Sequence, residues 1–247
     1  MTPAAHATAG GANAGGEQPV WCWCYRDSIC MAEANRNTCA PAARAVMLLD
    51  EAARRAVDLV VSAAGILLVS PLLLVLACIV KATSPGPALY VQRRVGRRGR
   101  PFGLIKLRSM TATSGGPQIT KAGDVRITRV GRFLRATKLD ELPQLINVLM
   151  GHMSLVGPRA EVPKYVELYT PEQRRVLDAK PGITGPAQVQ YIDEERILAA
   201  SSDPEATYVN EILPAKLSID LEYLRSRTVL SDLRILAVTL FRLVRRG

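Results

Sequence analysis

The chain has 247 residues, of which 48% are hydrophobic, so it can bury the core of one ordinary domain beside a small membrane element. Its formal net charge of +10 favours anionic partners such as lipid headgroups, nucleotides or nucleic acid. Only 5% of the residues are aromatic, which argues against a surface that stacks nucleic-acid bases on exposed rings.

Residues 1–43 are rich in Ala, Gly, Asn and Thr and have no sustained periodic pattern, so we expect a disordered arm. The arm lacks a basic stretch followed by an apolar core, so we do not expect a signal peptide. Unpaired thiols are the simpler interpretation of its cysteines, and a metal site is the alternative, because the spacing is not that of zinc knuckles. These cysteines are Cys22, Cys24, Cys30 and Cys39.

The clearest hydropathy feature lies in residues 44–83, where residues 57–80 form an apolar run longer than the roughly 20 residues of a membrane span. Ser70 and Pro71 fall in its middle, and proline removes a backbone hydrogen bond and bends a helix. Asp58 enters at one end, and basic residues flank both ends, unlike the one-sided charge of a crossing helix. The pattern favours a re-entrant helix that bends and returns to the same face; a kinked transmembrane helix is the alternative.

Residues 84–247 are expected to form one domain of mixed helix and strand. Residues 88–92 and 102–107 predict a β-hairpin around the arginine-rich turn at 93–100. A Gly/Thr/Ser-rich mobile loop is expected at 111–124. The segments with helical periodicity are residues 127–134, 140–150, 164–179, 191–207, 220–224 and 231–246. The last of them is amphipathic, so it can lie on an anionic membrane or pack on the core.

Asp140 and Glu141 are adjacent carboxylates at the start of a helical segment. Pro143 is tolerated only in a first turn, which predicts Asp140 near the N-cap and Glu141 at the first helical position. Capping and the helix dipole alone would account for two acids there. An acidic pair among cations can also hold Mg²⁺ with phosphate oxygens, or attack phosphorus directly. The candidate cations are Lys106, Arg108, Arg135, Lys138 and Arg159.

Four segments together resemble the bacterial sugar transferase family, the monotopic polyprenol-phosphate phosphoglycosyl transferases. They are the Ser70-Pro71 break, FGLIKLRSM at 102–110, LDELPQLINVLMGHMSLVGPR at 139–159 and KPGITG at 180–185. The resemblance covers residues 55–247. It implies an α+β fold: a re-entrant membrane helix, then a small, mostly helical cytoplasmic catalytic domain with a short β-hairpin.

The resemblance also implies an activity. The enzyme would transfer a sugar-1-phosphate from a UDP-sugar to polyprenol (undecaprenyl) phosphate, giving polyprenol-diphosphate-sugar and UMP through a covalent aspartyl-phosphosugar intermediate. This would be the first membrane step of surface glycan assembly, such as exopolysaccharide, O-antigen or capsule. The place would be the cytoplasmic face of the bacterial inner membrane, with anionic lipid and downstream glycosyltransferases as further partners and no nucleic acid.

The roles implied for single residues follow the family's motifs. Asp140 would be the nucleophile, and Glu141 would help to bind the cofactor Mg²⁺. The implied substrate-binding residues are Lys106, Arg135, Arg159 and the acid Asp220. One departure concerns residues 186–188, Pro-Ala-Gln, where many members carry an aromatic, so the sugar or nucleotide preference can differ.

Two other classes of function fit parts of the sequence. A non-catalytic membrane scaffold that recruits glycan enzymes is disfavoured, because Asp140 and Glu141 are both present. A membrane-tethered nucleic-acid-binding protein fits the charge of +10 and would be retained on DNA with a steep salt dependence.

Overall fold

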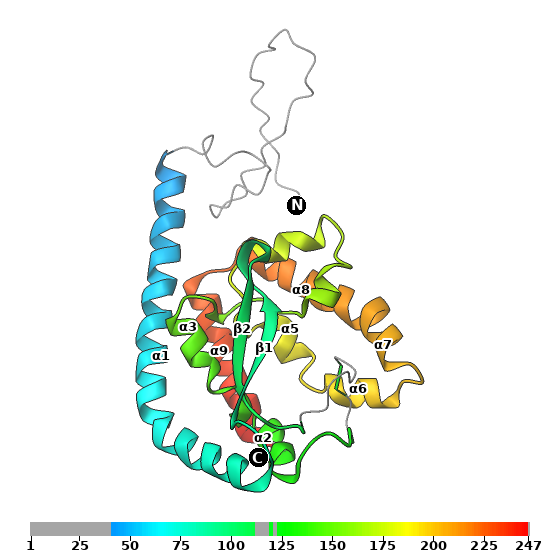
Figure 1. Ribbon diagram of the computed structural model, residues 1–247. Helices are drawn as coiled ribbons and strands as arrows, with labels where there is room; N and C mark the ends of the chain where they lie inside the picture. Colours follow the sequence, from blue (N-terminus) through cyan, green and yellow to red (C-terminus); the bar gives the residue numbers. More distant parts are fainter. Residues whose placement is uncertain (1–40, 112–118, 121–122, 247) are drawn as a thin grey trace, which may run out of the picture.

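The computed structural model describes residues 41–111, 119–120 and 123–246, which form helices around two small sheets (Figure 1). This mixture of helix and strand agrees with the α+β class. Most of the expected arm at 1–43 and of the expected loop at 111–124 lies outside the described residues. Residues 41–43 already belong to the first helix, so this helix begins before residue 44.

Helix α1 (Pro41–Thr83) lies along one side of the molecule and bends in its C-terminal part (Figure 1). Pro71 has no N–H to donate to the carbonyl of Leu67, and the hydroxyl of Ser70 donates to that carbonyl instead, at 3.0 Å. Within α1, residues Leu48–Thr83 are long and apolar enough to cross a membrane. Leu67 and Leu68 are 78% and 81% exposed, so protein does not cover this apolar surface.

Two short sheets organise the rest of the chain. Strands β1 (Leu89–Val95) and β2 (Pro101–Leu107) pair antiparallel, with the 3-10 turn η1 (Arg97–Gly99) between them. Strands β3 (Ser154–Val156) and β4 (Gly182–Thr184) pair in parallel. The expected strands at 88–92 and 102–107 are therefore present, whereas β3 and β4 are too short to leave a periodic pattern in the sequence.

Apart from α8 and α9 the other helices are short, and prolines divide two that the sequence predicted as long. The expected helix at 164–179 is wrong: Pro171 lies between α4 and η3. The expected helix at 191–207 is also wrong: α7 starts afresh at Pro204, where Asp203 caps it. The helical elements are α2 (Arg129–Ala136), η2 (Leu139–Glu141), α3 (Gln144–Leu149), α4 (Pro163–Val166), η3 (Gln173–Asp178), α5 (Pro186–Gln190), α6 (Glu194–Ala200), α7 (Pro204–Thr207), the π-turn η4 (Tyr208–Ile212), α8 (Leu213–Ser226) and α9 (Val229–Arg246).

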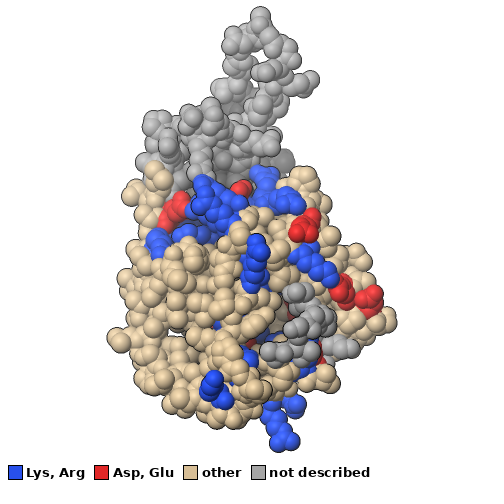
Figure 2. Space-filling model, in the orientation of Figure 1, with Lys and Arg blue, Asp and Glu red and all other residues tan. Residues whose placement is uncertain are grey.

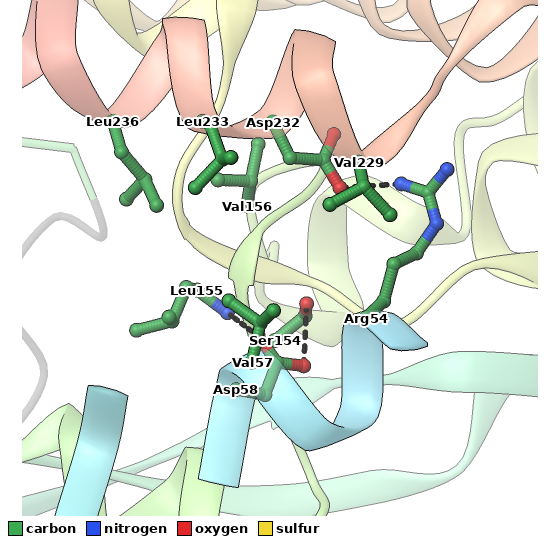
Figure 3. Close-up of a pocket in the computed structure, with 10 residues that line it drawn as sticks. All are labelled: Arg54, Val57, Asp58, Ser154, Leu155, Val156, Val229, Asp232, Leu233 and Leu236. Carbon is green, nitrogen blue, oxygen red and sulfur yellow. Dashed lines mark hydrogen bonds and ion pairs between the residues drawn. The ribbon is translucent and has the colours of Figure 1, made fainter. Parts of the chain in front are cut away.

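Buried polar side chains attach α1 to the domain (Figure 3). The Asp58 carboxylate accepts hydrogen bonds from the Ser154 hydroxyl at 2.8 Å and from the Leu155 N–H at 2.9 Å. One turn earlier, Arg54 forms ion pairs with Asp50 and, on α9, with Asp232. Polar groups on an apolar helix are stable when they find such partners, so the first part of α1 is bound to β3 and α9.

The second part of α1 is attached by packing and by a cap. Leu76 and Val80 form a buried cluster with Leu107 of β2 and Leu134 of α2. The guanidinium of Arg108 donates to the carbonyls of Val80 and Ser84, at 3.2 and 2.7 Å. The sequence analysis counted Arg108 among the candidate cations around Asp140 and Glu141. It instead caps the end of α1, because free carbonyls at a helix end attract a cation.

Helix α9 packs on the core, which is one of the two roles that its sequence pattern left open. Ile235 and Leu236 pack on the core beneath β3, and the Thr239 hydroxyl meets that of Thr184 at 2.8 Å. Leu240 and Phe241 stay 64% and 60% exposed on the other side of the helix. Core packing thus holds α9 and leaves an apolar stripe free.

Basic residues gather at the end of the molecule where the β1–β2 turn lies (Figure 2). Arg97 pairs with Glu51 of α1 at 2.6 Å and donates to the carbonyl of Asp178 at 2.8 Å. Arg98 and Arg100 of the same turn are exposed. The basic turn is therefore beside the N-terminal part of α1.

Candidate active site

The acidic pair lies in η2, a 3-10 turn, and not at the N-cap of the following helix. The N–H groups of Glu141 and Leu142 bond to the carbonyls of Lys138 and Leu139, and α3 begins only at Gln144. Pro143 is the N-cap residue of α3, so this helix does not include the acids. The expected N-cap position of Asp140 is therefore wrong, and its side chain caps nothing.

Asp140 is a buried carboxylate with a free oxygen. The residue is 5% exposed, and its Oδ1 has no hydrogen-bond partner among the described residues. Burial and then the neighbouring charge of Glu141 raise the pKa of Asp140 to about 6, against the opposing charges of Arg135, Lys138 and Lys106. Asp140 is thus mostly ionised at neutral pH and can offer an oxygen to a bound group.

Glu141 is in the opposite electrostatic situation. Burial would raise its pKa, but nearby cations overcome that effect and hold the pKa below its usual range. The same proximity raises the pKa of Arg159: its burial is outweighed by Glu141, Glu161 and Glu194. The cations that act on Glu141 are Arg159, Lys138, Lys106 and Arg94, in decreasing order.

Lys106, on strand β2, is close enough to Asp140 and Glu141 to interact with their charges. Its ammonium lies 3.4 Å from the Gln92 side-chain oxygen and 5.5 Å from the centre of the Tyr90 ring, both on β1. Burial, and then the charge of Arg94, lower the pKa of Lys106 to about 8. Lys106 is therefore a cation that can lose its charge in mildly alkaline solution.

Arg94 is a site residue that the sequence analysis missed, because it was counted with the basic turn. It lies 3.5 Å from Glu161 and donates to the carbonyl of Ala160 at 2.8 Å, which joins β1 to the segment after Arg159. Strand alternation was the available signal: Tyr90, Gln92 and Arg94 share the face that carries Lys106.

The two Gly/Pro turns of the sequence touch each other. Gly157 donates to the carbonyl of Thr184, and Gly182 donates to that of Pro158, both at 2.9 Å. A Cβ on Gly182 would lie 2.1 Å from the Gly157 nitrogen, so a side chain does not fit there. This contact brings Arg159 and Gln188 to one cavity, which is also lined by Arg94, Lys106, Glu141 and Gln144.

Asp140, Asp220 and Arg135 do not line this cavity, although Asp140 is the direct neighbour of Glu141, which does. Asp220 is 3% exposed in α8; burial raises its pKa to about 7, partly offset by the N–H groups of Ala187 and Arg159 and by Lys216. It thus supports the two turns from behind. Arg135, from α2, acts on Asp140 and pairs with Glu195.

The carboxylates of Asp140 and Glu141 are too few to hold Mg²⁺ alone, so water and substrate phosphate would have to complete its coordination. No group of three or more His, Cys, Asp or Glu side chains in the described part of the chain can hold a metal. Asp140 and Glu141 offer carboxylate oxygens, and Asp140 Oδ1 is unbonded. Mg²⁺ commonly takes one or two carboxylates and completes its shell with water and substrate phosphate, so these residues fit Mg²⁺.

Comparison with known proteins gives the family. The chain is 40% identical to a UDP-glucose:undecaprenyl-phosphate glucose-1-phosphate transferase of Caulobacter vibrioides, over 75% of this chain and 67% of that protein. It is 39% identical to the Escherichia coli protein of the same name, over 76% of this chain but only 39% of that protein. It is 37% identical to the exopolysaccharide production protein PSS of Rhizobium leguminosarum, over 81% of this chain and 98% of that protein.

Residues 49–246 match the family described as Bacterial sugar transferase, which takes in α1, both sheets and the acidic pair. The chain therefore belongs to the bacterial sugar transferase family.

Proposed function

We propose that this protein transfers a sugar-1-phosphate from a UDP-sugar to polyprenol phosphate, giving polyprenol-diphosphate-sugar and UMP. The observation that carries the proposal is the buried Asp140, whose free oxygen lies among the cations Lys106 and Arg135, beside Glu141. UDP-glucose is the first donor to test, because the Caulobacter and Escherichia coli relatives carry glucose-1-phosphate transfer in their names.

Asp140 is the proposed nucleophile. Its ionised oxygen attacks the phosphorus that bears the sugar, and the bond from that phosphorus to the bridging oxygen breaks as UMP leaves with the electron pair. A phosphate oxygen of polyprenol phosphate then attacks the same phosphorus, which breaks the bond to Asp140 and restores the carboxylate. Splitting the reaction lets a soluble substrate and a lipid substrate use one small site in turn.

The other residues stabilise charge. Lys106 and Arg159 hold the phosphate oxygens. Arg94 positions the Lys106 side chain through Gln92 and the Arg159 segment through the carbonyl of Ala160. Glu141, kept ionised by these cations, is the proposed Mg²⁺ ligand. Bound Mg²⁺ would neutralise charge that builds on the phosphates. Asp220 keeps the two turns in place.

We further propose that α1 is re-entrant in the bacterial inner membrane, with the domain on the cytoplasmic face. The bend near Ser70 and Pro71 and the attachment of both parts of α1 to one domain support this. The basic turn and the exposed stripe of α9 would rest on anionic lipid. The product would pass to downstream glycosyltransferases that extend a surface glycan.

Single cysteines placed before residue 50 and after residue 90, in a chain otherwise without cysteine, are expected to be labelled from the same side of the membrane. The reason is that Asp58 and Leu76 attach the two parts of α1 to one domain. Replacing Ser70 and Pro71 together by alanine is expected to straighten the helix. The two cysteines should then be labelled from opposite sides of the membrane. Labelling from opposite sides in the natural sequence would exclude the re-entrant arrangement.

Incubation with UDP-glucose alone is expected to release up to one equivalent of UMP and to add one hexose-phosphate mass to the peptide that holds Asp140. Asp140→Asn should abolish the adduct and lower turnover by about 1,000-fold or more, since an amide is a poor nucleophile. Intact-protein and peptide mass spectrometry measure both. If UMP appears only when polyprenol phosphate is also present, direct transfer is the better mechanism.

Chelation of divalent cations is expected to stop turnover, and added Mg²⁺ to restore it. Glu141→Gln should cost about 100-fold or more in kcat, because charge stabilisation at a transferring phosphoryl group is a large effect. Glu222→Gln, at an exposed position of α8, is the matched control and should match the natural enzyme. Full turnover in the presence of chelator would remove the metal from the mechanism.

The pH profile of kcat/KM is expected to be bell-shaped. Below about pH 6 Asp140 takes up a proton and can no longer attack, and above about pH 8 Lys106 loses the charge that binds phosphate. Lys106→Arg keeps a positive charge at all these pH values, so it should remove the alkaline limb and keep the acid limb. An alkaline limb that is unchanged in this variant would show that another group causes it.

A further inference from the structure

The acidic tip of α6 is unused by the proposed mechanism, although it reaches two cations near the site. The helix begins with Glu194 and Glu195, and Leu198, 0% exposed, packs its other face into the core. In Figure 1, α6 lies at the edge of the domain, next to α7. Two adjacent carboxylates at a helix start can be explained by the helix dipole alone, but here each one meets a cation from a different element.

The two ion pairs differ in burial. Glu194 meets Lys216 of α8 at 2.7 Å, and the Lys216 side chain is only 5% exposed. Glu195 pairs with Arg135 of α2, and the Glu195 side chain is 41% exposed. Breaking a buried pair leaves an unpaired buried charge, whereas an exposed partner returns easily to water. The Glu194 contact is therefore the fixed one, and Glu195 is the carboxylate that can leave.

Arg135 has hydrogen-bonding capacity left for a ligand. Its Nη1 meets only the Met110 sulfur, at 3.8 Å, and its buried Nε has no hydrogen-bond partner in the described part of the chain. Its charge acts on both Asp140 and Lys106. A guanidinium binds phosphate through two parallel N–H groups, so a phosphate beside Asp140 would seek the same guanidinium that Glu195 holds.

We propose that Glu195 competes within the molecule with the donor's diphosphate for Arg135, and leaves it when the donor binds. This inference rests on the proposed function, since it takes a nucleoside diphosphate as the ligand. The Glu194–Lys216 pair and Leu198 keep α6 in place while the Glu195 side chain moves into solvent. In the empty enzyme the Glu195–Arg135 pair thus neutralises Arg135 and lowers the enzyme's affinity for the donor.

The test measures the binding of UDP, with Mg²⁺ present, to the full chain in detergent by calorimetry. Glu195→Gln is expected to bind UDP about 2- to 5-fold more tightly, the worth of a part-exposed ion pair. Glu205→Gln is the matched control, because Glu205 also pairs with a cation, the exposed Lys164, but on α7. Its affinity should not change. Thermal unfolding checks that each variant is folded; if Glu195→Gln is not, Glu195→Ala takes its place with the same expectation.

A double-mutant cycle separates competition from other effects. In an Arg135→Gln background, Glu195→Gln should no longer tighten UDP binding, because no guanidinium is left to release. Equal or weaker binding by folded Glu195→Gln overturns the proposal, as does a gain that persists without Arg135 or a natural enzyme that does not bind UDP. Failure to release UMP from UDP-sugars would overturn the proposed function instead, because UDP binding needs no turnover.

Discussion

The fold depends on polar contacts buried against an otherwise apolar helix. Asp58 bonds to the backbone and side chain of β3, and Arg54 pairs with α9, so charged residues join the first part of α1 to the domain. Charges on such a helix are costly unless each has a partner. Strand β3 continues directly into the turn that carries Arg159, so the same contact that holds α1 also sets the position of a cation in the site.

The site separates two neighbouring carboxylates by environment. Asp140 is buried in η2, and its pKa rises to about 6, whereas the pKa of Glu141 falls because four cations act on it. Groups of the same chemical type that differ in this way can take different roles in one reaction. Asp140 lies within the 3-10 turn and has an unbonded oxygen, whereas an N-cap side chain would bond to the N–H groups of the helix.

Some long patterns in the sequence predicted the fold, but the long helices expected at 164–179 and 191–207 are divided at prolines, and local geometry was not predicted. The apolar run of α1, the amphipathic pattern of α9 and the strand pair around the basic turn were all legible, because each repeats over several residues. The roles expected of two arginines were reversed. Arg108 was expected at the acids but caps α1, whereas Arg94 was counted with the basic turn but lines the cavity. Position relative to motifs could not distinguish them, since charge alone does not tell which partner a long side chain reaches. The pair β3–β4 is formed by three-residue strands that lie far apart in the sequence, and its parallel contact exists only in the folded chain.

The attachment of α1 also orders events during synthesis. Arg54 and its partner Asp232 are separated by 178 residues, and Asp58 and Ser154 by 96. At about 5–20 residues per second, the ribosome needs roughly 10–35 s to deliver Asp232 after Arg54. In the membrane arrangement proposed above, α1 leaves the ribosome long before these partners exist, so its own sequence sets its orientation. In that arrangement the completed domain closes onto a helix that has already entered the bilayer, and its ion pairs preserve the orientation after translation ends.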